Sequence, residues 1–205
     1  MEYIENDNYF NTKVKICFFI GIIFILVSCH KEYNYNKEAI ELNNKAMEEI
    51  SSGNLIYGLM LLNEAKEKDE TYFLPYYNSG FVYKQLKDYG KAIDEYNIAL
   101  NKNIPSSYII IVNLNIGYSY ELLHDIENAN LYYNEALEIL DKIIAEQKNE
   151  KIRSNNKLER EMVYFLLNKI EKYNNELKDL LLNKDKNIQN TANLLQNIER
   201  KDIVQ

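Results

Sequence analysis

The sequence predicts an all-α protein, a solenoid of about three helix-turn-helix hairpins followed by a C-terminal amphipathic helix. Its 205 residues include only six glycines and two prolines, too few for a turn-dense β-sandwich or a flexible linker protein. Small and turn-forming residues recur at constant offsets through the middle of the chain. Near the end of the chain, apolar residues recur at threes and fours, which is typical of an amphipathic helix.

The chain is acidic, which narrows the partners it can have. Its formal net charge is −7 and its isoelectric point is near 5.1. A protein that holds a phosphate backbone needs a basic face. We therefore expect no nucleic-acid partner.

The first local feature is a short apolar run near the N-terminus. Lys13 and Lys15 precede this run, which covers residues 16–27 and is followed by a serine and Cys29. A charged segment, a short apolar segment and a small residue, in this order, are typical of an export signal. As a helix, about 12 residues rise only ~18 Å, well short of the ~30 Å hydrocarbon core, which disfavours a membrane-spanning anchor. We predict a signal peptide over residues 1–28.

Residues 26–29 read Leu-Val-Ser-Cys and resemble the lipobox of bacterial lipoproteins. In that family the cysteine thiol receives a diacylglycerol, the peptidase cuts just before it, and the new amino terminus is usually acylated. The resemblance implies that Cys29 is lipidated and anchors the mature chain to a membrane of a bacterial cell envelope, because two or three acyl chains suffice for stable attachment. Two alternatives are a signal peptide with a chance cysteine at its end and an uncleaved anchor.

The segment after the signal is expected to be a tether. Residues 29–36 show no apolar periodicity and connect the anchor with the folded body. Cys17 lies in the predicted signal peptide, so lipidation of Cys29 leaves the mature chain without a thiol. Packing alone must then hold the exported domain, because no disulfide and no cysteine metal ligand is available.

The body of the chain contains an internal repeat. Small or turn-forming residues of the first copy recur 34 residues later in the second copy and a further 37 residues on in the third. The three copies cover residues 37–70, 71–104 and 105–148. The corresponding sets are Ala46, Gly53, Gly58, Leu62 and Ala65; Gly80, Lys87, Ala92, Tyr96 and Ala99; and Gly117, His124, Ala129, Tyr133 and Ala136.

These spacings resemble the tetratricopeptide repeat (TPR), a 34-residue helix-turn-helix with small residues where its two helices cross. The resemblance spans about residues 39–140 and is strongest in the second copy. Independently of it, Asn54, Asp88 and Asp125 stand at one repeat position and are good N-caps for the second helix of each hairpin. Three such repeats are about the minimum for independent stability.

The resemblance implies a protein or peptide partner, because the first helices of TPR repeats line a concave groove that binds segments of other proteins. Asn44, Asn78 and Asn115 share one repeat position, and an asparagine amide can both donate to and accept from a peptide backbone. The alternative is that asparagine recurs there only because this chain uses it so often. By position, the groove candidates are Asn43, Asn44, Met47, Tyr77, Asn78, Phe81, Lys84, Asn115, Tyr118 and Glu121.

A clamp for a C-terminal carboxylate is not expected in this groove. TPR domains that carry such a clamp use Lys and Asn on the first helix, Asn on the next and a cation on the third. Asn78 fits, but Asn43 and Met47 stand where the first pair belongs, and Leu114 and Tyr118 supply no cation. We expect the groove to take an apolar anchor side chain or an amphipathic helix.

Beyond the repeats, the last hairpin helix is expected to continue to about Gln147, and a break then follows over residues 149–156. Apolar residues recur at threes and fours downstream and predict one amphipathic helix within residues 155–183. This helix either caps the last repeat or forms a coiled-coil seam that makes the protein a homo-oligomer. Residues 184–205 are expected to be a weakly ordered tail.

No residue pattern predicts catalysis, a metal site or a cofactor. His30 lies beside the lipidation site and His124 in a turn, and neither has a second histidine at ligand spacing. The sequence has no HExxH motif, Gly-rich phosphate loop or Ser-His-Asp arrangement. We expect a non-enzymatic, lipid-anchored adaptor that binds a protein partner, as in an envelope assembly or secretion machinery. The alternative is a structural lipoprotein that self-associates through its C-terminal helix.

Overall fold

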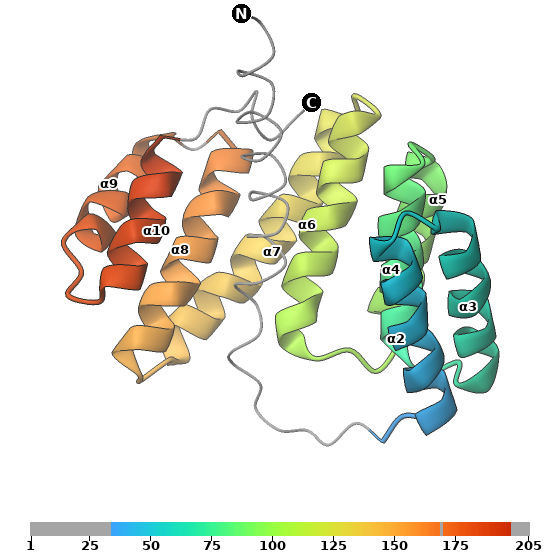
Figure 1. Ribbon diagram of the computed structural model, residues 1–205. Helices are drawn as coiled ribbons and strands as arrows, with labels where there is room; N and C mark the ends of the chain where they lie inside the picture. The colour runs from blue at the N-terminus through green and yellow to red at the C-terminus, as the bar shows by residue number, and fades with distance from the viewer. Residues whose placement is uncertain (1–33, 169, 198–205) are drawn as a thin grey trace, which may run out of the picture. The chain divides into compact units, whose positions relative to one another are not determined.

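The computed structural model describes residues 34–168 and 170–197, in which every regular element is an α-helix (Figure 1). The chain divides into two compact units. We refer to residues 34–136 as the repeat unit and to residues 137–197 as the C-terminal unit. The predicted signal peptide and Cys29 lie outside the described residues.

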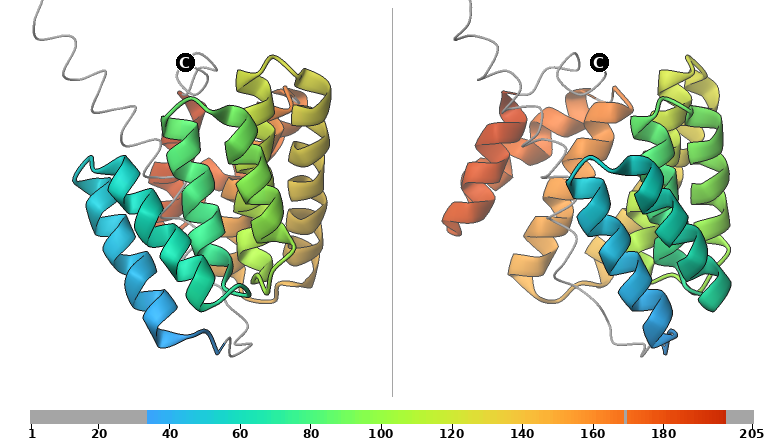
Figure 2. Two further views of the ribbon diagram at one scale, coloured as in Figure 1. Left: turned by 90° about the vertical axis from the view of Figure 1, so that its right-hand side faces the viewer. Right: turned by 45° about the vertical axis from the view of Figure 1, so that its right-hand side comes forward.

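The repeat unit is built of helical hairpins whose successive helices run antiparallel and lie side by side (Figures 1 and 2). The predicted all-α fold of helical hairpins is confirmed, and the hairpins lie within the three predicted copies. Their helices are α2 (Lys37–Ser51) and α3 (Leu55–Lys68), α4 (Phe73–Gln85) and α5 (Tyr89–Leu100), and α6 (Ser106–Leu122) and α7 (Ile126–Glu146), which continues into the C-terminal unit.

Each hairpin turn contains one residue in the left-handed backbone region. Gly53 has φ +88°, Lys87 +62° and His124 +61°, and the three share one repeat position. Only glycine adopts this region without a steric penalty, so the backbone is strained at the lysine and the histidine. The same sharp turn thus recurs in all three copies whatever side chain it carries.

The residue after each left-handed residue directly precedes the next helix. The Asp88 side chain accepts a hydrogen bond from the Lys91 backbone N–H at 3.3 Å, and the Asp125 side chain accepts one from the Asn128 N–H at 3.1 Å. Both are N-caps of the predicted kind. Asn54 holds the same position in the first copy, but its side chain makes no cap bond.

The two helices of a hairpin approach so closely that glycine is required at the crossing. A Cβ atom on Gly80 would lie 2.6 Å from the Tyr96 ring, and one on Gly117 would lie 2.6 Å from the Tyr133 ring. Both tyrosines are almost completely buried. The small residues that mark the repeat in the sequence are therefore the contact points of its helices.

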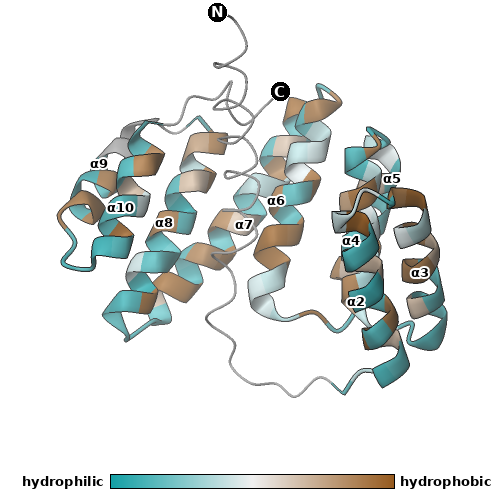
Figure 3. Ribbon diagram, in the orientation of Figure 1, coloured by the Kyte–Doolittle hydropathy of each residue, from teal (hydrophilic) through white to brown (hydrophobic). Residues whose placement is uncertain are grey.

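The helix α6 is apolar on every side over residues 109–112, and Figure 3 shows a brown stretch in this helix. Ile110, Ile111, Val112 and Ile116 are all at most 5% exposed. A helix that is apolar on every side belongs to the interior of its fold. Burial of such a helix on several faces stabilises the third hairpin.

The C-terminal unit contains three further helices, α8 (Glu150–Leu166), α9 (Ile170–Leu181) and α10 (Lys186–Gln196). The prediction of one helix within residues 155–183 is wrong, because the chain turns between α8 and α9. Asn168 there has φ +57°, and its backbone N–H donates to the Phe165 carbonyl at 3.1 Å. A left-handed asparagine just after a helix is a C-terminal stop signal.

The predicted break over residues 149–156 is also wrong, since α8 begins within it. The Asn149 side chain accepts hydrogen bonds from the backbone N–H groups of Lys151 and Ile152, at 3.0 and 3.2 Å. This N-cap offsets the poor helix propensity of the Ser-Asn-Asn run that follows. The gap after α7 therefore shrinks to residues 147–149.

The prediction of a weakly ordered tail over residues 184–205 is wrong for residues 186–196, which form α10. The Asp185 side chain caps this helix by accepting from the Asn187 N–H at 2.9 Å. Three apolar residues on one face of α10 are buried, namely Ile188, Ala192 and Leu195. A cap and a short apolar face together fold a segment whose pattern is weak in the sequence.

The apolar stripe predicted as a self-association seam is buried in this protein. The helices α8, α9 and α10 pack against one another. Four leucines of this stripe are at most 7% exposed, namely Leu158 and Leu166 on α8 and Leu177 and Leu180 on α9. A coiled-coil seam between copies needs this stripe at the surface.

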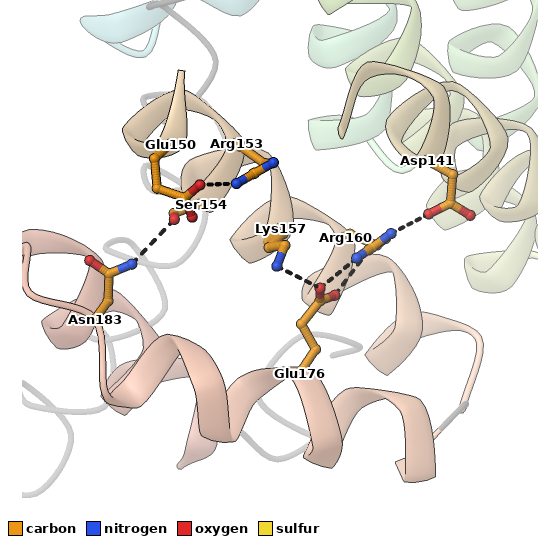
Figure 4. A network of polar contacts seen from close by, with 8 residues as sticks. All are labelled: Asp141, Glu150, Arg153, Ser154, Lys157, Arg160, Glu176 and Asn183. Carbon is orange, nitrogen blue, oxygen red and sulfur yellow. Dashed lines mark hydrogen bonds and ion pairs between the residues drawn. The ribbon is translucent and has the colours of Figure 1, made fainter. Parts of the chain in front are cut away.

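A polar network ties the elements of the C-terminal unit together (Figure 4). The Arg160 guanidinium donates from Nε to Glu176 on α9 at 3.0 Å and from a terminal nitrogen to Asp141 on α7. Lys157 lies one turn earlier, with its ammonium 3.7 Å from the same Glu176 carboxylate. One arginine thus joins three helices through a fork-shaped donor that matches carboxylates.

Candidate functional site

The ten predicted groove residues lie on the first helices of the three hairpins, and the structure divides them by depth. Three are buried, six are half-buried and one is exposed. The buried residues are Asn43, Asn78 and Glu121, the half-buried ones are Met47, Tyr77, Phe81, Lys84, Asn115 and Tyr118, and the exposed one is Asn44.

The shared asparagine position joins each first helix to the one before it. The Asn78 amide on α4 donates to the Asn43 side-chain oxygen on α2 at 2.8 Å, and both side chains are buried. In the next copy, the Asn115 side chain on α6 is hydrogen-bonded to Tyr77 on α4. Asn44 is exposed at the same position of the first copy. Asn78 and Asn115 therefore each join a first helix to the one before it, which is a structural role for two of the three asparagines at this repeat position.

The half-buried residues of α4 and α6 form one cluster around an ammonium group. The Lys84 nitrogen donates to the Asn115 side-chain oxygen at 2.5 Å. It also lies 5.3 Å from the centre of the Tyr118 ring and 5.8 Å from that of Phe81. A cation at these distances from two aromatic faces is held by cation–π attraction. We refer to Phe81, Lys84, Asn115 and Tyr118 as the groove cluster.

Tyr77 extends the aromatic surface beside the groove cluster. Its ring centre lies 5.7 Å from Tyr96 and 6.4 Å from Tyr108. Burial raises the pKa of the Tyr77 hydroxyl well above its usual value of 10. This tyrosine therefore stays neutral at physiological pH and acts as an apolar side chain with one polar group.

Charged side chains are scarce on the two helices that carry the cluster. Lys84 is the one charged residue of α4, and Glu121 is the one charged residue of α6. Glu121 is buried and accepts a hydrogen bond from the Tyr133 hydroxyl at 2.9 Å. The surface of α4 and α6 is therefore aromatic and amide-rich with a single ammonium, although the chain carries a net charge of −7.

Sequence reasoning missed Tyr108 as a neighbour of the candidate site. Its ring centre lies 4.7 Å from Phe73 and 6.4 Å from Tyr77. At the constant offset of 37 residues Tyr108 aligns with Thr71, which is not aromatic. Repeat alignment therefore gives no sign of an aromatic residue at this position.

Two further kinds of feature, metal-ligand groups and membrane-spanning helices, are not found among the described residues. They contain no group of three or more histidine, cysteine, aspartate or glutamate residues that would hold a metal ion. Their helices include none that is both long and apolar enough to cross a bilayer.

Comparison with known proteins gives neighbours in structure alone. No family model matches the sequence, and no curated protein matches it. The first TPR domain of human RPAP3 has 18% identity over 66% of this chain and 96% of its own, with a TM-score of 0.47. The MamA crystal structure has 14% identity over 77% of this chain and 78% of its own, with a TM-score of 0.47. YrrB, described as a TPR protein with an unusual peptide-binding site, has 20% identity over 78% of this chain and 94% of its own, with a TM-score of 0.45. At such identities the likeness concerns the arrangement of helices and nothing more.

Proposed function

We propose that this chain is a lipid-anchored adaptor that binds a segment of another protein along α2, α4 and α6. The observation that carries this proposal is the groove cluster, in which rings and polar groups of two adjacent helices meet at the half-buried surface. Aromatic rings held in place by packing give large contact area at little cost in conformational entropy, and binding hot spots are enriched in them.

The chemistry of the cluster indicates the kind of segment that fits. Phe81 and Tyr118 offer two aromatic faces, and the Lys84 ammonium and the Asn115 amide offer polar groups between them. A ligand with an apolar anchor side chain would pack against the rings, and a hydrogen-bond acceptor next to that side chain would bind the polar groups. An amphipathic helix or an extended segment presents such groups at regular spacing.

The anchor part of the proposal depends on Cys29 and the lipobox-like residues before it. The acyl chains would hold the mature protein to a membrane of a bacterial cell envelope, because each buried CH₂ contributes ~0.8 kcal/mol. A partner that the groove binds would then be concentrated at that membrane, in an assembly or secretion machinery of the envelope.

A site-specific crosslinking experiment tests the groove. A photoreactive amino acid replaces Tyr118 in the full chain on native membranes, and a matched variant carries it at Ile98, which is 40% exposed on the second helix α5. We expect one partner to be crosslinked from position 118 and not from position 98, and the crosslink to weaken in a Phe81→Ala background. Equal crosslinking from both positions contradicts a groove-bound segment.

A second experiment tests the anchor by itself. Cys29→Ser removes the acceptor thiol without touching the described fold. We expect this variant to lose incorporation of labelled fatty acid and to leave the membrane fraction on flotation. A Cys29→Ser chain that is cleaved after residue 28 and still floats with membranes would overturn the lipid anchor.

A further inference from the structure

The end of the predicted tether is packed onto the repeat unit. The Tyr35 ring centre lies 4.5 Å from that of Tyr72 and 6.4 Å from that of Phe73. The Tyr35 hydroxyl donates a hydrogen bond to the backbone carbonyl of Asn103. From Tyr35 onward the chain is therefore held against the loops that precede α4 and α6.

Asn36 fixes the chain a second time, one residue further on. Its backbone N–H donates to the Asp69 carboxylate at 2.9 Å, and its side chain caps α2 by accepting from the Glu38 N–H at 2.8 Å. The same carboxylate group binds the hydroxyl of Thr71 at 2.7 Å. The tether thus enters the fold at a defined point, beside the turn between α3 and α4.

This entry point lies on the edge of the repeat unit at which α2, α4 and α6 begin (Figure 1). We define the tether edge as residues 34–38, 68–73 and 101–106. The hairpin turns lie at the opposite ends of these helices. Since α2 has 15 residues, the two edges are separated by about 22 Å at a rise of 1.5 Å per residue.

The tether edge is electrically balanced, in contrast to the chain as a whole. It carries three basic and three acidic residues, Lys37, Lys68 and Lys102 against Glu38, Asp69 and Glu70. Anionic headgroups repel an acidic surface and leave a balanced one largely unaffected. Such an edge meets little repulsion from an anionic lipid surface.

Tyrosines at this edge suit a lipid–water boundary. Tyr35 is half-buried there, and the half-buried Tyr76 lies just beyond the edge, in the first turn of α4, with its ring centre 4.9 Å from the Lys102 ammonium. Tyrosine side chains are enriched at membrane interfaces because the ring is apolar and the hydroxyl is wet. A lysine beside such a ring places its charge at headgroup level.

We infer that the tether edge faces a bilayer surface, with α2, α4 and α6 pointing away from the lipid. This inference rests on the lipid anchor proposed above. Cys29 lies six residues before Tyr35, and six extended residues reach at most about 20 Å. The anchor and the packed Tyr35 together keep the tether edge close to the headgroups and leave the groove cluster to the side, open to a partner in water.

Energy transfer to labelled lipids tests this orientation. The full lipidated chain is reconstituted in vesicles of phosphatidylethanolamine and phosphatidylglycerol that contain an acceptor lipid. A donor dye is attached to a single introduced cysteine, by Glu70→Cys at the tether edge or by Glu127→Cys near the turn between α6 and α7. The two exposed glutamates are matched in charge, and the lipidated Cys29 leaves no competing thiol.

We expect stronger transfer from position 70 than from position 127, and a loss of this difference when a flexible Gly-Ser segment is inserted after His30. Flotation of the labelled chains is measured in the same samples. Chains that float but transfer equally from both positions, or more from position 127, overturn the orientation and leave the anchor standing. Chains that do not float overturn the anchor, and the orientation with it.

Discussion

The hydroxyl of Tyr133 donates a 2.9 Å hydrogen bond to the buried carboxylate of Glu121, across the third hairpin. Tyr96 occupies the equivalent position in the second hairpin, and its buried hydroxyl has no hydrogen-bond partner among the described residues. The residue equivalent to Glu121 is Lys84, which donates to Asn115 and offers no acceptor. The second hairpin therefore lacks the hydrogen bond that joins Tyr133 to Glu121 in the third hairpin. At the position of the missing acceptor it carries Lys84, the cation of the groove cluster.

Removing the two hydroxyls should have opposite consequences. Tyr133→Phe takes a donor from a buried carboxylate, which costs about 1–3 kcal/mol. Tyr96→Phe removes a hydroxyl that is buried without a partner, so we expect the free energy of unfolding to stay the same or rise. Urea denaturation followed by circular dichroism measures both. An equal loss of unfolding free energy in the two variants would contradict a stabilising role that is specific to the Tyr133–Glu121 hydrogen bond.

The close helix crossing at Gly117 can be tested by comparing the same substitution at two glycines, Gly117 and Gly90. Gly117→Ala places a Cβ 2.6 Å from the Tyr133 ring and 3.0 Å from the Ala129 carbonyl, so the hairpin must open. Overpacking of this kind costs about 1–3 kcal/mol, against which alanine recovers ~1 kcal/mol of helix propensity.

Gly90 on α5 is the control, because a Cβ there meets nothing within 4 Å. Gly90→Ala should raise the unfolding free energy by about 0.5–1 kcal/mol through helix propensity alone. The two substitutions are chemically identical, so their difference in denaturation midpoint measures the crossing itself. A stabilised Gly117→Ala variant would mean that Tyr133 moves aside at no cost.

The repeat fold could be predicted from the sequence because its determinants are local and recur. The closest crossings admit only glycine, and two of the three turns are followed by a capping aspartate, so both features leave marks at fixed spacing. The break after α8 leaves no such mark. Apolar residues recur at helical spacing on both sides of Asn168 without interruption. Because asparagine is so common in this chain, a single asparagine does not indicate a helix end in the sequence. Only its left-handed backbone shows that the helix stops there.

The candidate site could be predicted to the level of helix face and no further. Position within the repeat selected residues that lie on the first helices, among them Phe81, Lys84 and Tyr118. It did not show that Asn43 and Asn78 use their polar atoms on each other. How deeply a side chain is buried, and which polar group it bonds, depend on contacts with the neighbouring hairpin. The residue pattern of one repeat carries no information about these contacts.

The turn at Asn168 can be tested by changing the residue that tolerates it. Asn168→Ala forces a β-carbon into the left-handed region, which costs about 1–2 kcal/mol. Asn168→Gly keeps that conformation accessible and should leave stability nearly unchanged. Denaturation of both variants gives the comparison, and size-exclusion with light scattering follows their mass. A stable, dimeric Asn168→Ala chain would indicate that α8 and α9 had fused into a long helix with its stripe exposed.

Two glutamates of α8 make the C-terminal unit sensitive to pH. Glu161 is fully buried, and this burial, together with the negative charge of the nearby Glu176 carboxylate, raises its pKa to about 9. Burial likewise raises the pKa of Glu159 to about 8. Arg160 and Lys157 lie near Glu161 and oppose the shift, but desolvation of the carboxylate outweighs them.

The sign of the resulting pH dependence follows from proton binding. In the unfolded chain these carboxyls lose their protons near pH 4.3, whereas the folded chain keeps them up to pH 8 or 9. Between these limits the folded state therefore binds more protons than the unfolded state. The stability that these two groups contribute is greatest below about pH 4 and falls as the pH rises to about 9.

Glu161→Gln should flatten this decline and raise the stability of the protein at pH 8. Titration of the glutamate side-chain carbons by NMR checks the cause directly, since Glu161 should change its shift above pH 7. A Glu161 resonance that titrates near pH 4, in a folded protein, would contradict this account.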